Sequence, residues 1–213
     1  LAETCLHIAN VLSRFGDTNA MNGQLDEAEK LLTSSALLTF RGKYHFLRGM
    51  SQMLSRIYDA AEKSFDSART FFGHDQSHEL MLLSAVKRAE CCRHQSRHDE
   101  AVSILTDVLN KTETSKHPQV MAEAEYLLGS IAVVNPAAVS EKAIVYFKQG
   151  IETLAKEPVS ETTWKLTFAL AREYFERGQR ERTREYLLKT KLILQFFLSH
   201  FTSQELKDQY LTV

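Results

Sequence analysis

The chain has 213 residues, 44% hydrophobic and 25% charged, which suits one domain or one solenoid segment with a sizeable core. Its 26 basic and 27 acidic residues leave a formal net charge of -1, so no electrostatic footprint points directly to nucleic acid or to an anionic membrane. Only 8 glycines and 3 prolines occur, which favours long helices joined by short turns.

The cysteines indicate a reducing compartment. There are three, Cys5, Cys91 and Cys92, and an odd number with two adjacent does not suit a disulfide framework. We therefore expect an intracellular, cytoplasmic protein, with the nucleus as an alternative. No secretory signal is visible, and the longest apolar run, residues 192–198, is far shorter than a membrane span. Because the chain begins at Leu1, we expect it to be a fragment of a larger protein.

A recurring segment predicts five helical hairpins in chain order. Each copy has a small or polar turn, a polar pair, a small marker residue and a large residue four positions later. The marker residues are Ala28, Ala61, Ala101, Ala143 and Thr183, separated by 33, 40, 42 and 40 residues. A repeat near a fixed period is typical of solenoid proteins, so we expect ten helices, with the last long one from about 181 to 201.

A second small residue precedes most markers by twelve positions, and we place it on the first helix of each hairpin. These residues are Gly16, Gly49, Ala89 and Ala171, whereas Gly129 lies fourteen positions before Ala143. Small residues on both helices let an antiparallel pair approach closely, and larger residues such as Phe65, Leu105 and Phe147 then fill the space beside them.

This pattern resembles the tetratricopeptide (TPR) repeat, which has a small residue in helix A, a Gly-x-Tyr-x-x-Ala turn, and an aromatic and an Ala in helix B. The second copy matches it with Tyr58, Ala61, Phe65 and Ala68. Most spacings are near 40 residues rather than the usual 34, so armadillo and HEAT repeats are the structural alternative.

The resemblance implies an all-α fold, a right-handed superhelical solenoid of about five antiparallel helix-turn-helix repeats over residues 1–201. Residues 202–213 are expected to form a C-terminal capping helix and tail, because Thr202 and Glu205 have the spacing of a capping box. Phe196, Phe197, Leu198 and Phe201 make the preceding helix end strongly apolar. If the last helix does not cover this surface, it becomes a site for self-association or another partner.

The resemblance also implies a partner-binding concave face built from the first helix of each hairpin. Carrying the register over predicts partner-binding roles for Asp17, Phe46, Met50, Glu90, Arg93, Tyr126, Ser130, Phe168 and Arg172, with Asn10, Ser13, Lys43, Val86, Glu123 and Lys165 on the same face. The alternative is that the aromatic members pack between neighbouring hairpins. The Lys/Asn clamp with which chaperone-binding members hold a C-terminal carboxylate has no match at these positions.

The sequence offers no catalytic constellation. Cys91, Cys92, His94 and His98 invite a metal interpretation, but adjacent cysteines on a helix point about 100° apart, and a packed core is the simpler reading. There is no Gly-rich phosphate loop, no His-Glu-x-x-His and no Gly-x-Ser-x-Gly motif. We therefore expect no enzyme activity, no cofactor and no metal.

Two functions remain open from the sequence. The first is a protein-protein interaction scaffold that binds a peptide or a partner protein, as part of a larger regulatory or assembly protein. The second is a ligand- or peptide-sensing regulatory module of a signalling ATPase, a kinase or a transcription regulator. An effector domain elsewhere in the full-length protein would favour the second.

Overall fold

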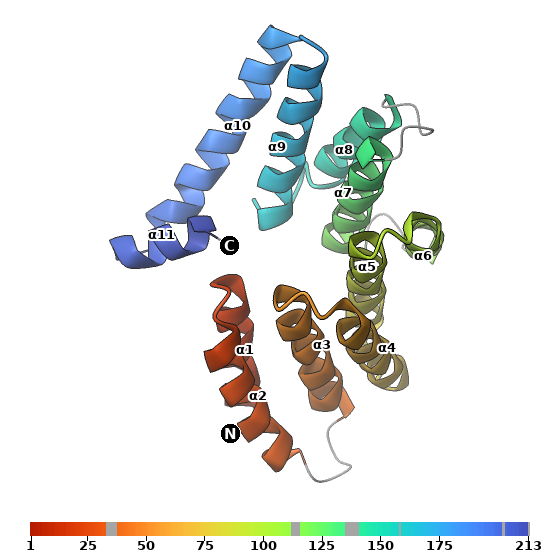
Figure 1. The fold of residues 1–213 in the computed structure, drawn as a ribbon, viewed down its shortest axis with the longest axis vertical. Helices are drawn as coiled ribbons and strands as arrows, with labels where there is room; N and C mark the ends of the chain where they lie inside the picture. Colours follow the sequence, from red (N-terminus) through yellow and green to blue (C-terminus); the bar gives the residue numbers. More distant parts are fainter. Residues whose placement is uncertain (33–37, 112–115, 135–140, 158, 202, 213) are drawn as a thin grey trace. The chain divides into compact units, whose positions relative to one another are not determined.

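The computed structural model describes residues 1–32, 38–111, 116–134, 141–157, 159–201 and 203–212, and these residues contain helices and no strand (Figure 1). The helices are α1 (Ala2–Arg14), α2 (Thr18–Leu31), α3 (Leu38–Leu54), α4 (Tyr58–His74), α5 (His78–His94), α6 (His98–Lys111), α7 (Pro118–Val134), α8 (Glu141–Thr153), α9 (Glu161–Glu176), α10 (Arg180–Ser199) and α11 (Gln204–Thr212). The all-helical prediction is confirmed. In the described chain, no helix is both long and apolar enough to cross a membrane.

The second helix of four hairpins follows one recurring tight turn. The residue two positions before α2, α4, α6 and α10 has a positive φ: Gly16 at 68°, Arg56 at 61°, Ser96 at 61° and Gly178 at 68°. In three of these turns a backbone N–H then bonds a carbonyl five residues back, from Ile57 to Gln52 at 2.8 Å, from Arg97 to Cys92 at 2.9 Å and from Gln179 to Tyr174 at 2.9 Å. This is the bond that closes a Schellman motif, and in each case the second helix of the hairpin begins two residues after the positive-φ residue.

The turns correct the register of the first repeat. Gly16, not Gly23, forms the first turn, and Gly23 lies within α2. Five residues after each turn come Met21, Ala61, Ala101 and Thr183, so the first marker is Met21 rather than Ala28. The first spacing is then 40 residues instead of 33, and the small residue twelve positions before Met21 is Ala9, which is fully buried.

Small residues on the first helix of a hairpin receive aromatic rings from the second, as predicted. A Cβ added at Gly49 of α3 would lie 2.8 Å from Cε1 of Phe65 in α4. A Cβ added at Gly42 of α3 would lie 2.6 Å from the ring of Phe72, which is also in α4. Gly129 of α7 receives the ring of Phe147 in α8 in the same way. These rings are buried, so they fill the contact between the paired helices.

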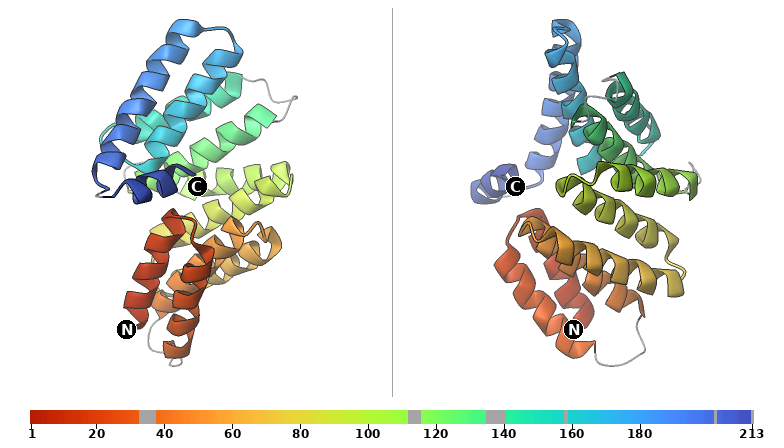
Figure 2. Two further views of the ribbon diagram at one scale, coloured as in Figure 1. Left: turned by 60° about the vertical axis from the view of Figure 1, so that its left-hand side comes forward. Right: turned by 45° about the vertical axis from the view of Figure 1, so that its right-hand side comes forward.

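The chain divides into two compact units. Unit 1 comprises residues 1–101 and 203–213, and unit 2 comprises residues 102–202. In unit 1, α1 packs on α2 and α3, and α3 and α5 both pack on α4. In unit 2, α7 packs on α8 and α9, and α9 packs on α8 and α10 (Figure 2). Both units are therefore built from consecutive helical pairs.

The C-terminal helices follow the predicted boundaries closely, because α10 ends at Ser199 and α11 begins at Gln204. Thr202, half of the predicted capping box, lies outside the described residues. Leu192 and Phe196 of α10 are 66% and 51% exposed. A capping role for residues 202–213 stays a prediction.

Candidate functional site: an apolar pocket on the first helices of unit 1

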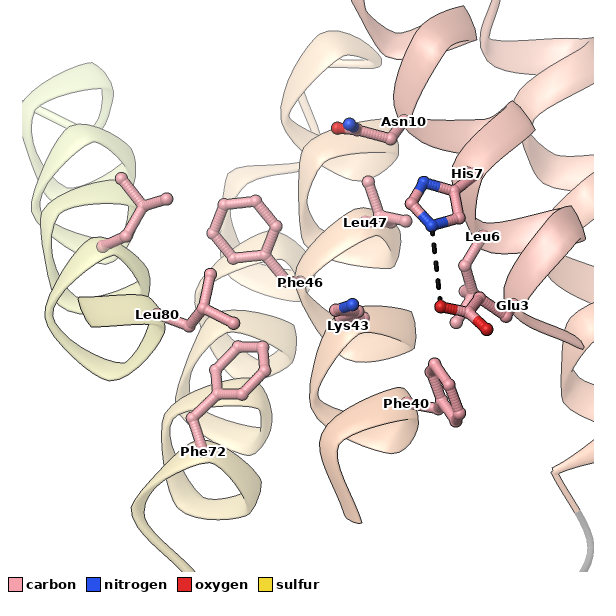
Figure 3. Close-up of a pocket in the computed structure, with 11 residues that line it drawn as sticks. Glu3, Leu6, His7, Asn10, Phe40, Lys43, Phe46, Leu47, Phe72 and Leu80 are labelled. Atoms are coloured by element: carbon pink, nitrogen blue, oxygen red, sulfur yellow. Dashed lines mark ion pairs between the residues drawn. The ribbon is translucent and has the colours of Figure 1, made fainter. Parts of the chain in front are cut away.

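The candidate site is a pocket of about 270 Å³ in unit 1. It lies against α1, α3 and α5, the first helices of the three N-terminal hairpins, with one ring from α4 (Figure 3). Its lining residues are Glu3, Leu6, His7, Asn10, Phe40, Lys43, Phe46, Leu47, Phe72, Leu80 and Leu83.

The repeat period explains why these residues meet. The pocket residues of α1, α3 and α5 fall into sets 40 residues apart, such as Glu3, Lys43 and Leu83. Residues one period apart occupy equivalent places on successive first helices, so their side chains face the same way. The three helices thus present one continuous strip of surface.

Aromatic packing fixes the walls of the pocket. Phe72 is fully buried because Gly42 leaves room for its ring beside α3. Phe46 is half-buried and meets Phe65 edge to face, with ring centroids 5.6 Å apart. Such aromatic pairs are held by both area burial and ring electrostatics, so we expect a largely preformed wall.

The polar groups of the pocket lie mainly on α1. Figure 3 shows His7 and Asn10 on that helix, and His7 Nε2 is 3.8 Å from a carboxylate oxygen of Glu3. Lys43 of α3 stands between this polar side and the apolar side formed by Phe46 and Leu80. The arrangement is an apolar cavity with a few polar groups, which is typical of ligand and peptide sites.

The structure places some predicted binding residues at this pocket and others elsewhere. Phe46 lines it, as do Asn10 and Lys43. Met50 is half-buried and packs against the hydrophobic cores of unit 1. Asp17 is not on a first helix: it caps α2, where its carboxylate accepts a hydrogen bond from the Ala20 N–H at 3.0 Å. The misplacement of Asp17 follows from the register error in the first repeat.

On α5 the predicted residues are engaged with neighbours on the same helix. Glu90 forms an ion pair with Lys87 at 3.2 Å. Arg93 Nη2 donates to His94 Nε2 at 2.9 Å. Val86 is fully buried, so it belongs to the core and not to a binding face.

Unit 2 carries its own set of predicted residues. Tyr126 is half-buried, with its ring 6.1 Å from that of Phe147, and the Ser130 hydroxyl donates to the Tyr126 carbonyl at 2.8 Å. Phe168 and Arg172 lie one turn apart on α9 and are both exposed, Phe168 to 48%. Tyr126 therefore packs on Phe147 of its own hairpin, whereas Phe168 is exposed, and a partner-binding role for these residues stays a prediction.

The sequence reasoning missed most of the pocket: Glu3, Leu6, His7, Phe40, Leu47, Phe72, Leu80 and Leu83. A signal for several of them was present, because a step of 40 residues from Lys43 leads to Glu3 and to Leu83. The spacing of 33 assigned to the first repeat concealed this relation.

The cysteine-rich segment belongs to an ion-pair cluster in unit 1. Ligand atoms of Glu62, Cys92 and Glu100 lie within 4.8 Å of one another. Arg88 Nε is 3.1 Å from Glu62, and its Nη2 is 3.1 Å from Glu100, while Arg97 bonds both carboxylates. The guanidinium groups already satisfy these carboxylates, which ties α4 to α5 and to the start of α6.

Ionisation of the same cluster also favours a structural role. Burial raises the pKa of the Cys92 thiol to about 11, so the thiolate that binds metals or acts as a nucleophile is disfavoured at neutral pH. Burial would raise the pKa of Glu62, but hydrogen bonds from Arg97 and Arg88 outweigh it and lower that pKa. The carboxylates of the cluster therefore bind Arg88 and Arg97.

Comparison with known proteins finds similarity among solved structures. No protein-family model matches the sequence, and no curated protein matches it. The fold is similar to two solved structures of the nearly identical TPR-like repeats of a protein assigned as a Podosopora anserina kinesin light chain. The TM-scores are 0.61 and 0.59, each at 19% sequence identity, with 90% of this chain and 93% of that chain covered. The chain therefore has the fold of TPR-like repeats, as its sequence pattern predicted.

Proposed function

We propose that this chain is a non-catalytic protein-protein interaction scaffold whose unit 1 pocket holds a peptide or an exposed segment of a partner protein. The observation that carries the proposal is the pocket itself, because it joins equivalent surfaces of three successive first helices. An extended or helical segment lying across them could place its side chains in successive positions, one repeat after another.

The composition of the pocket supports peptide binding. Phe40, Phe46, Leu80 and Leu83 are half-buried apolar residues that a ligand side chain could cover. A volume of about 270 Å³ accommodates one or two large side chains, while the polar groups of α1 orient the chain that carries them. The cytoplasmic location expected from the cysteines suits a scaffold of this kind.

A displayed random-peptide library tests the proposal without a known partner. The full chain should enrich peptides with a shared apolar pattern. The variant Leu83→Glu, which places a charge in the pocket, should weaken the enriched peptides at least tenfold. Leu31→Glu is the matched control, because Leu31 is 47% exposed and does not line the pocket.

Two results would contradict the proposal. If Leu83→Glu binds the selected peptides as well as the parent chain does, the pocket is not the binding site. If the library yields no shared pattern, the pocket does not hold peptides of this kind.

A further inference from the structure

Lys43 is a charged residue of the pocket without an ion-pair partner among the described residues. Among the eleven lining residues, all of which the structure describes, the formally charged ones are Glu3 and Lys43, with His7 titratable. Glu3 faces His7 at 3.8 Å. Lys43 forms no ion pair with any described carboxylate, and its Nζ lies 5.6 Å from the centroid of the Phe40 ring.

The position of Lys43 makes this charge matter. Lys43 is half-buried, and Figure 3 shows it between Phe46 and Leu80 on one side and Glu3 and His7 of α1 on the other. Glu3 differs, because its side chain is 58% exposed and can stay hydrated at the rim. A ligand that fills the pocket would therefore remove water from Lys43 more than from Glu3.

Desolvation then selects the ligand. Covering an ammonium group with apolar side chains costs free energy unless a partner replaces the lost water. The Phe40 ring supplies only a weak cation–π attraction at a site open to solvent. A carboxylate on the ligand supplies the missing charge-assisted hydrogen bond.

From this arrangement, and resting on the proposed function, we infer that the pocket recognises a peptide in which an aspartate or glutamate side chain lies next to apolar residues. The acidic side chain pairs with Lys43, and the Asn10 amide can donate a further hydrogen bond to it. The apolar neighbours cover Phe46, Leu80 and Leu83.

Parallel library selections on the full chain test the assignment. The parent chain should enrich an acidic residue at a fixed distance from an apolar one. Lys43→Glu should enrich Lys or Arg at that position instead, and should bind the parent's peptides at least tenfold more weakly. Lys63→Glu is the matched control, because Lys63 is exposed on α4 outside the pocket, and it should select as the parent does.

Two outcomes would overturn the inference while leaving the proposed function standing. One is that the selected peptides share a pattern without an acidic residue, and that Leu83→Glu still loses binding to them. The other is an unchanged selection by Lys43→Glu, with circular dichroism showing that the variant is folded. Failure of the proposed function is separate, because it gives no shared pattern or no effect of Leu83→Glu.

A last arm identifies the source of the carboxylate. Synthetic versions of the selected peptides, with amidated C-termini, should bind as tightly as those with free C-termini. Loss of binding on amidation would assign the carboxylate to the peptide terminus and would overturn the side-chain assignment.

Discussion

The same substitution, glycine to alanine, should have opposite effects at two helical positions of unit 1. Gly23 lies inside α2 with nothing within 4 Å of an added Cβ, so Gly23→Ala should stabilise the chain by about 0.5–1 kcal/mol through helix propensity. Gly49→Ala has the same propensity gain. However, its Cβ would lie 2.8 Å from Cε1 of Phe65 and 2.9 Å from two more ring atoms, against about 3.5–4.0 Å for favourable carbon contacts.

The ring of Phe65 has little freedom to yield. It is fully buried and already meets Phe46 edge to face. Overpacking of this kind costs about 1–3 kcal/mol, so the net effect of Gly49→Ala should be a loss of roughly 0–2 kcal/mol. At about 2–4 °C per kcal/mol for a chain of this size, the two variants should differ in melting midpoint by several degrees.

Urea and thermal unfolding followed by circular dichroism at 222 nm would measure the pair under identical conditions. Comparing two variants of one chain removes most of the uncertainty that a repeat protein brings, since its repeats need not unfold in one step. If Gly49→Ala is as stable as Gly23→Ala, the close packing of α4 on α3 is not as described, and the TPR-like account of the small residues fails.

The other predictions concern packing, ionisation and the C-terminus. Ala61→Leu should destabilise by about 1–3 kcal/mol, because Ala61 is fully buried, and an unchanged unfolding midpoint would contradict the register. Burial raises the pKa of Glu125 to about 7, against a hydrogen bond from the Thr153 hydroxyl, so the native state holds this proton more tightly than the unfolded chain does. Its contribution to stability, about 3 kcal/mol, is complete below pH 4.5 and is lost as the pH rises through about 7. Glu125→Gln should lack this part of the pH dependence, and parallel pH profiles of the two chains would refute the assignment. A chain without residues 203–213 should show concentration-dependent light scattering through the apolar end of α10, and a truncated chain that stays monomeric would remove the capping role.

The sequence by itself predicted the helical repeat because two independent patterns agreed. Three of the four marker spacings were 40 to 42 residues, and small residues preceded four of the five markers by twelve positions. Two contacts, Gly49 with Phe65 and Gly129 with Phe147, show why the prediction succeeded. Close helix packing limits the size of the residues at the contact, so these positions can be recognised in the sequence.

The site was harder to predict than the fold. Phe46, Phe168 and Arg172 were placed on exposed or half-exposed surfaces of first helices, as the structure has them. Aromatic residues there can serve either a partner or the core, and Tyr126 beside Phe147 illustrates the second use. Sequence periodicity predicts which side chains share a face of a helix. It does not predict which of them the neighbouring helix leaves exposed.

Only the tertiary structure decided the register of the first repeat. Gly16 and Gly23 are seven residues apart, and seven residues are almost two full helical turns, so shifting the register by that amount keeps the same side chains on the same face. The apolar pattern of α2 fits both alternatives, and Met21, Leu25 and Ala28 are all buried. The turn at Gly16, with its positive φ, separates α1 from α2, so Glu3 and Lys43 occupy equivalent positions of successive repeats and Asp17 becomes the cap of α2. The pocket exists because successive first helices align in this register, and that alignment depends on packing between helices of different hairpins, such as α1 on α3, rather than on any local pattern.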